Sequence, residues 1–156
     1  MLKKVMIGLL IVVVAIPAMY YMSLVVFCPV INDVRAAKIE KEFFNIPVPP
    51  KTEIVESYSF CGNTSGTGNH VEIWSGILVK SELPETELIQ WAEGISMSNI
   101  VYEPLLWAVP EDRTSQYPQS RKFIEFEHFN GMSEAKRYYI MGGYFDAVTQ
   151  HDIRGH

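Results

Sequence analysis

The feature that most constrains this chain is a run of 27 residues, Val5 to Ile31, with no charged side chain. An α-helix rises about 1.5 Å per residue, so this run spans about 40 Å, more than the roughly 30 Å hydrocarbon core of a bilayer. Lys3 and Lys4 precede the run, and Pro17 lies inside it, where membrane helices tolerate proline. Residues 1–31 are therefore predicted to form a transmembrane anchor.

Two processed forms compete with an uncleaved anchor. A cleaved signal peptide has an apolar stretch of about 7 to 15 residues and a small-x-small cleavage site. Here the stretch is longer, and the candidate site at residues 16–18 begins with the bulky Ile16. A lipoprotein signal places a small residue before the modified cysteine, but Cys28 follows Phe27. We therefore expect an uncleaved, single-pass anchor.

Orientation is predicted from the Lys and Arg residues that flank the segment. Lys3, Lys4 and the amino terminus precede it, whereas three basic residues follow it among acidic neighbours, at positions 35, 38 and 41. A short tail with two lysines resembles the start of a signal anchor. We expect the N-terminus inside the cell and the C-terminal domain outside it. The protein would then be held in the cell membrane by one helix, with an extracytoplasmic domain.

Charge limits the partners of the remaining 125 residues. All 18 acidic residues lie from Asp33 onward, where they face 11 basic ones, for a net charge of −7. Nucleic-acid-binding domains usually present a basic face, so we expect no nucleic-acid partner. A chain of this size buries one core and leaves little material for a second domain around a cleft.

The part after the anchor divides into a connection and a domain. Residues 33–45 combine good helix formers with acidic and basic residues at neighbouring turns, which is typical of a polar stalk helix. Three prolines within residues 47–50 end any helix, because proline lacks a backbone N–H. We expect a stalk and Pro-rich linker over 32–50 and a small soluble domain over 51–156.

The hydrophobic pattern of this domain predicts the α+β class, with one antiparallel sheet and one main packed helix. The main helix is expected within residues 81–97, where apolar residues recur at helical spacing. Asn130-Gly131 predicts a hairpin turn, and Gly142-Gly143 predicts a bulge or bend. Period-two alternation predicts strands over 52–60, 71–80, 121–129 and 135–141, with weaker strands at 100–109 and 144–148.

A glycine-rich loop over residues 61–70 connects the first two predicted strands. A Walker loop needs Gly-Lys-Ser/Thr leading into a helix, whereas this loop has no lysine and leads into a strand. A plain turn and contact with a polar ligand are the two interpretations left. The candidate ligand-binding residues are Asn63, Gly66, Gly68, Asn69 and His70.

Catalytic candidates are few. Cys61 would need a histidine to deprotonate it, and Glu127 with His128 would have to serve as a base. No family-specific sequence surrounds either, so we expect no catalytic residue and no cofactor. His151 and His156 are five positions apart, which is not a recognised metal-ligand spacing, so no metal site is expected.

The chain ends on DIRGH, residues 152–156. Such an ending is either a docked last strand or a terminus that a partner recognises. For the second interpretation, the candidate contact residues are Asp152, Arg154 and His156.

Several short motifs resemble a group of small, single-pass, membrane-anchored proteins of Gram-positive bacteria: PVPPKT at 47–52, GTGN at 66–69, ILVKSEL at 77–83 and the DIRGH ending. The resemblance covers residues 45–156 and departs at Pro84, where a serine-like helix start is common. It implies a bacterial origin, a single anchor and a compact domain, and it implies no activity, substrate or catalytic residue.

These features favour a membrane-anchored, extracytoplasmic binding or interaction module without catalytic activity, with a protein partner in the cell envelope. Two alternatives stay open. One is a small hydrolase or transferase at the membrane surface that uses Cys61 or the pair Glu127 and His128. The other is an accessory subunit of a membrane complex, whose anchor packs against larger subunits.

Overall fold

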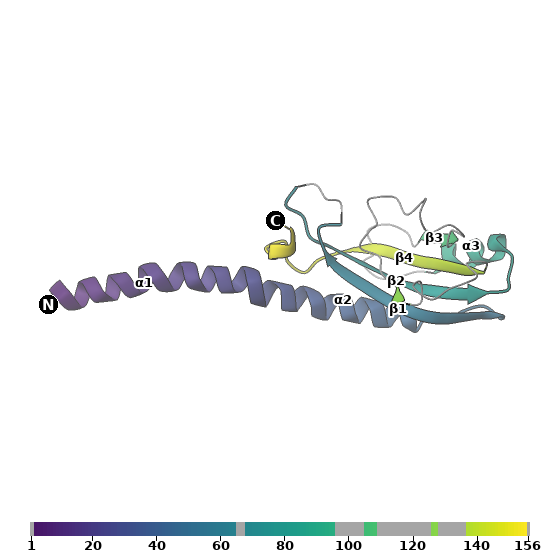
Figure 1. The fold of residues 1–156 in the computed structure, drawn as a ribbon, viewed down its shortest axis with the longest axis horizontal. Coiled ribbons are helices and arrows are strands. Elements are labelled where there is room, and N and C mark those ends of the chain that lie inside the picture. Colours follow the sequence, from purple (N-terminus) through teal and green to yellow (C-terminus); the bar gives the residue numbers. More distant parts are fainter. Residues whose placement is uncertain (1, 65–67, 96–104, 109–125, 128–136, 156) are drawn as a thin grey trace.

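The computed structural model describes residues 2–64, 68–95, 105–108, 126–127 and 137–155. A long N-terminal helix runs along the molecule, and its second half lies against a β-sheet (Figure 1). The C-terminus returns to the start of that second half (Figure 1). The fold thus joins the two ends of the domain at its junction with the apolar helix.

The N-terminal helix has three consecutive parts, α1 (Leu2–Met22), a π-helical turn η1 (Ser23–Phe27) and α2 (Cys28–Phe44). Together they form one continuous helix, and its stretch Lys3–Phe44, 42 residues long, is a candidate membrane span. Its most apolar stretch is not buried by the described protein, and by length and composition the helix is able to cross a membrane. This confirms the predicted helix in its coarse form.

Helix α2 contributes one face to the core of the domain. Its buried residues recur every three or four positions: Cys28, Asn32, Ala36, Ile39 and Phe43. The ring of Phe43 packs edge-on against Phe145, with ring centroids 5.9 Å apart. The segment expected to be a polar stalk therefore does not stand off the domain, because its few apolar residues share one helical face.

The sheet has four antiparallel strands in the order β1-β2-β4-β3. Their bounds are β1 (Thr52–Gly62), β2 (Glu72–Ser81), β3 (Leu105–Ala108) and β4 (Tyr138–Asp146). The helix α3 (Glu85–Glu93) follows β2, as the pattern over 81–97 predicts, and its Ala92 joins the same hydrophobic cluster as α2. The α+β class with one antiparallel sheet is confirmed, and α2 is a second, longer packed helix.

A pair of facing glycines shapes the other side of the sheet. Gly76 of β2 lies opposite Gly142 of β4 in unbroken register. A Cβ atom on Gly142 would lie 2.5 Å from Cζ2 of Trp74, and one on Gly76 would lie 2.5 Å from the carbonyl oxygen of Met141. The bulge expected at residues 142–143 is therefore wrong, since these glycines make room for the indole ring inside a regular strand.

The other strand predictions have mixed outcomes. The strands expected at 52–60 and 71–80 form as β1 and β2, and those at 135–141 and 144–148 form the single strand β4. Four residues of the stretch 100–109 form β3. The strand expected at 121–129 falls outside the described residues apart from Phe126 and Glu127, which are not in a strand, and the turn at 130–131 is also outside them.

Candidate functional site

The glycine-rich loop and the C-terminal ending, which hold the candidate binding residues, lie together at one end of the domain. The C-terminal turn η4 (Ile153–Gly155) contacts both α2 and β1. The backbone N–H of Asn63, in the loop after β1, donates to the carbonyl oxygen of Arg154 over 3.3 Å. In Figure 1 this end of the domain lies where the long helix first meets the sheet. We call it the membrane-proximal end.

Asn32 of α2 holds the C-terminal tail, residues 148–155, to the helix. Its side chain is fully buried, and its Nδ2 donates to the carbonyl oxygen of Thr149 at 3.0 Å and to Oδ2 of Asp152 at 2.9 Å. The N–H of Thr149 donates back to Oδ1 of Asn32 at 3.1 Å. Because a buried amide without partners is costly, these bonds fix where the tail lies on α2.

Arg154 completes the network. Its Nε donates to both carboxylate oxygens of Asp152, at 3.0 and 3.2 Å, and its Nη2 donates to Oδ2 of Asp152 at 2.6 Å. Nη1 lies 2.6 Å from Oδ1 of Asp33, and Nη2 also reaches the carbonyl oxygen of Pro29 at 3.2 Å. One guanidinium thus joins the tail to the first turns of α2. We call Asn32, Asp33, Asp152 and Arg154 the tail network.

Charge within the tail network stabilises the ionised groups. Burial works to raise the pKa of Asp152, but the hydrogen bonds from Arg154 and Asn32 outweigh it and hold that pKa below its usual value. The hydrogen bond to Asp152 and the one to Asp33 raise the pKa of Arg154, against its partial burial. The pair is therefore ionised at neutral pH, with the fully buried carboxylate satisfied by its partners.

The tail also packs on the start of β2. The side-chain amide of Gln150 pairs with the backbone of Val71, accepting from its N–H at 2.8 Å and donating to its carbonyl oxygen at 2.9 Å. Gly155 is buried, and a Cβ atom there would lie 2.4 Å from Cγ2 of Val71. The DIRGH ending is thus docked through Asp152, Arg154 and Gly155, although as the turn η4 and not as the expected strand, while His156 lies outside the described residues.

The glycine-rich loop beside the tail is held by its own hydrogen bonds. Nδ2 of Asn63 donates to the carbonyl oxygen of Gly68 at 2.9 Å, and Gly68 has a φ of 68°, which favours glycine. Nε2 of His70 lies 3.0 Å from one carboxylate oxygen of Glu72, whose other oxygen accepts from Thr64. Asn69 and His70 are exposed, and Gly66 lies outside the described residues.

The catalytic candidates do not form a site among the described residues. Cys61 is buried, and burial raises the pKa of its thiol to about 11, although the charge of Arg154 partly opposes this. Since the thiolate is the nucleophile, such a cysteine is a poor one at neutral pH. Glu127 is exposed, with its backbone N–H donating to Glu56 at 2.8 Å, and His128 lies outside the described residues.

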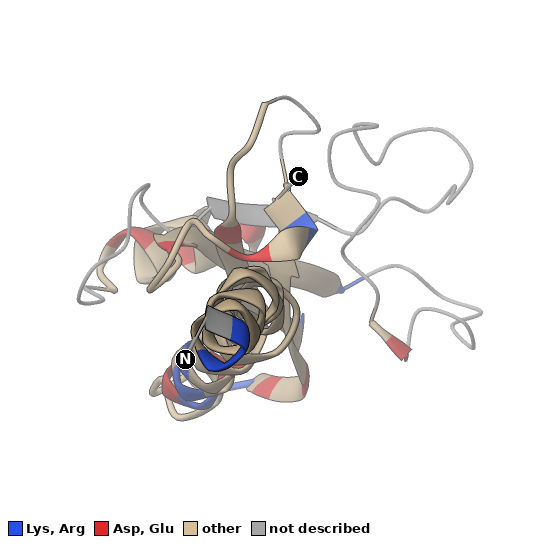
Figure 2. Cartoon of the chain, turned by 90° about the vertical axis from the view of Figure 1, so that its left-hand side faces the viewer, with Lys and Arg blue, Asp and Glu red and all other residues tan. Residues whose placement is uncertain are grey.

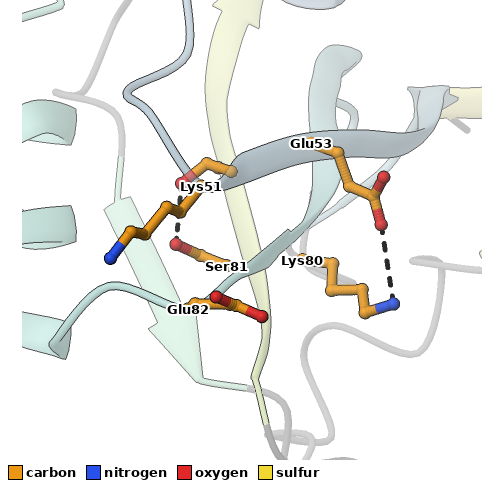
Figure 3. A pocket seen from close by; sticks show the side chains of 6 residues that line it. Lys51, Glu53, Lys80, Ser81 and Glu82 are labelled. Carbon is orange, nitrogen blue, oxygen red and sulfur yellow. Dashed lines mark hydrogen bonds and ion pairs between the residues drawn. The ribbon is translucent and has the colours of Figure 1, made fainter.

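A polar cavity lies at the other end of the hairpin, with a volume of about 320 Å³. Its lining consists of Lys51, Thr52, Glu53, Lys80, Ser81 and Glu82 (Figure 3). Nζ of Lys80 is 3.6 Å from Glu53, and the hydroxyls of Thr52 and Ser81 are 2.7 Å apart. Four of the six lining residues are thus paired with one another, and Glu82 pairs with Arg137 at 3.5 Å.

Metal binding finds no support in the described part of the chain, where no group of three or more His, Cys, Asp or Glu side chains is placed to hold an ion. Sequence reasoning missed Asn32, Asp33 and Gln150 as partners of the tail. A signal for Asn32 was present, because it shares the helical face of Ala36, Ile39 and Phe43 and follows directly on the apolar run.

Comparisons with protein-family models, with curated proteins and with solved structures find no match to this chain.

Proposed function

We propose that this protein is a single-pass membrane protein whose C-terminal domain binds a protein partner in the cell envelope and has no catalytic activity. The observation that carries the proposal is the tail network, which fastens the end of the chain to the first turns of α2, where the apolar run ends. A domain fixed in this way presents its loops at a constant height and orientation above the bilayer.

The contact surface of this module is the described part of the glycine-rich loop, residues 63–64 and 68–70, which lies beside the docked tail. Asn69 and His70 are exposed, while Asn63, Thr64 and Glu72 hold the loop by hydrogen bonds. Residues that are already held by such bonds lose less conformational entropy when they bind. Because the surface lies beside the helix, a membrane protein or its juxtamembrane segment suits it best, which favours the accessory-subunit form of the proposal.

The buried, protonated thiol of Cys61 supports binding over the hydrolase or transferase alternative. If the protein acts by binding, the Cys61→Ala protein still complements any phenotype that loss of the gene causes. Loss of complementation by a Cys61→Ala protein that still folds would favour the enzyme.

Orientation is tested with one engineered cysteine, because Cys28 and Cys61 are both buried and give little background. Intact cells that produce the Asn69→Cys variant are treated with a membrane-impermeant thiol reagent. Labelling without permeabilisation supports a domain outside the cell. Labelling only after permeabilisation contradicts the extracytoplasmic part of the proposal.

Partner binding is tested by placing a photo-crosslinking amino acid at Asn69 in the full-length protein and irradiating intact cells. Glu87, which is exposed on α3, provides the matched control. A discrete adduct that forms from Asn69 and not from Glu87 supports the assigned surface. Equal products from both positions, or none from either, contradict it.

A further inference from the structure

Few large apolar side chains of the described domain face solvent. Beyond α2, three of them are exposed: Ile89 at 39%, Val148 at 58% and Ile153 at 42%. Ile89 lies on α3, but the other two belong to the tail. Ile153 stands between the two partners of the ion pair Asp152 and Arg154, and Val148 precedes Thr149. Two of the three exposed positions therefore gather at the membrane-proximal end.

The tail network sets the height of these side chains along the helix. It holds the tail to Pro29, Asn32 and Asp33. A hydrocarbon core takes about 20 helical residues, so a 27-residue apolar run extends beyond it. Because Lys3 and Lys4 mark the other boundary of the core, the excess lies at the C-terminal end of the run, which puts exposed Phe27, Val30 and Ile31 in the headgroup layer. The tail is level with them.

From this placement we infer that the membrane-proximal end of the domain rests on the lipid bilayer, with Val148 and Ile153 inserted into the headgroup layer beside the helix. The inference rests on the proposed membrane anchor. It adds a second contact between the protein and lipid, made by the folded domain itself. Such a contact prevents the domain from tilting freely about the helix.

Apolar burial, not charge, drives this contact. The charged groups of the tail network are a single arginine with two carboxylates, Asp33 and Asp152. Figure 2 shows the chain along the helix, with described residues of both signs coloured blue and red. Zwitterionic lipid is therefore sufficient, and salt is not expected to release the contact, unlike a polybasic one.

The test measures membrane depth in the full-length protein, reconstituted in phosphatidylcholine vesicles. One cysteine at a time is added to the two buried native ones, by Ile153→Cys, Val148→Cys, Ile89→Cys or Val13→Cys, and carries an environment-sensitive fluorophore. Nitroxide-labelled lipids with the quencher near the headgroup or deep in the chain report where each probe lies. Ile89 is the matched control, since its exposure is close to that of Ile153.

We expect headgroup-level quenchers to reduce the fluorescence of the probes at positions 153 and 148 and to leave the probe at 89 unchanged. The deep quencher reduces the fluorescence at position 13. Raising NaCl from about 0.05 M to about 0.5 M leaves the loss at positions 153 and 148 unchanged, because the contact is apolar. Two tail positions are used so that misfolding of one variant does not decide the result.

Two outcomes overturn the inference, and they differ. If position 13 is quenched by the deep lipid but positions 153 and 148 behave like position 89, the anchor stands and the domain does not rest on the bilayer. If position 13 is not quenched, the anchor itself fails, and with it the proposed function.

Discussion

Asn32 in the long helix and Asp152 in the C-terminal turn are 120 positions apart, yet Nδ2 of Asn32 donates to Oδ2 of Asp152 over 2.9 Å and both side chains are fully buried. This bond joins the N-terminal helix to the last residues of the chain. The domain is therefore attached to the helix by polar contacts as well as by packing against the apolar face of α2.

Asn32→Ala is expected to destabilise the domain by about 1–3 kcal/mol, because it removes both side-chain hydrogen bonds to the backbone of Thr149 and one of the hydrogen bonds to the buried carboxylate of Asp152. Denaturant unfolding of the full-length protein in detergent measures the change. Asn69→Ala removes an exposed asparagine and serves as control. An equal, small effect of both substitutions would contradict the structural role of Asn32.

The tail network predicts how stability depends on pH. Since the folded pKa of Asp152 is lowered, its contribution is complete above the ordinary aspartate pKa of about 3.9 and is lost as the pH falls through the folded value. The unfolding midpoint should therefore drop in acid. Asp152→Asn is expected to be less stable at pH 7 and to show a smaller drop. An unchanged pH profile in this variant would assign the acid sensitivity to other carboxyl groups.

The sequence predicted the parts of the fold that local pattern determines. Alternation identified β1 and β2, and helical spacing identified α3. The acidic and basic residues of α2 obscured Ala36, Ile39 and Phe43, since a sparse apolar face is hard to distinguish from a solvated helix. Partners of the tail were missed for another reason: the helical face of Asn32 is a local signal for its burial, but its hydrogen bond to Asp152 depends on tertiary packing, which no local pattern predicts.

Cys61 is expected to resist alkylation in the folded protein. With a pKa of about 11, its thiolate fraction at pH 8 is about two orders of magnitude below that of an ordinary cysteine. Burial slows the reagent further. Iodoacetamide labelling followed by mass spectrometry, with the denatured protein as control, measures the ratio. Equal labelling rates in the folded and denatured protein would show that the thiol is accessible.

Gly142→Ala is expected to destabilise the domain by about 1–3 kcal/mol, because the new Cβ atom would lie 2.5 Å from the ring of Trp74 and 2.9 Å from the carbonyl oxygen of Ser75. Gly94→Ala is the control, since Gly94 has a negative φ and a Cβ atom there would be 3.4 Å from its nearest neighbour. Thermal unfolding compares the two. Equal stability of both variants would mean that β2 and β4 accommodate a methyl group at position 142.

Arg154→Lys tests whether the tail needs the fork of a guanidinium or only a positive charge. Arg154 serves Asp152, Asp33 and the carbonyl oxygen of Pro29 at once, and a lysine ammonium does not reproduce this planar set of donors. Loss of one or two of these bonds is expected to cost about 1–2 kcal/mol.

Arg137→Lys is the matched control, because its ion pair with Glu82 is long, at 3.5 Å, and exposed. Surface pairs of this kind contribute little, so the control should unfold at the same denaturant concentration as the parent protein. If Arg154→Lys also unfolds there, charge alone holds the tail, and the geometry of the network is not what fixes the domain on its helix.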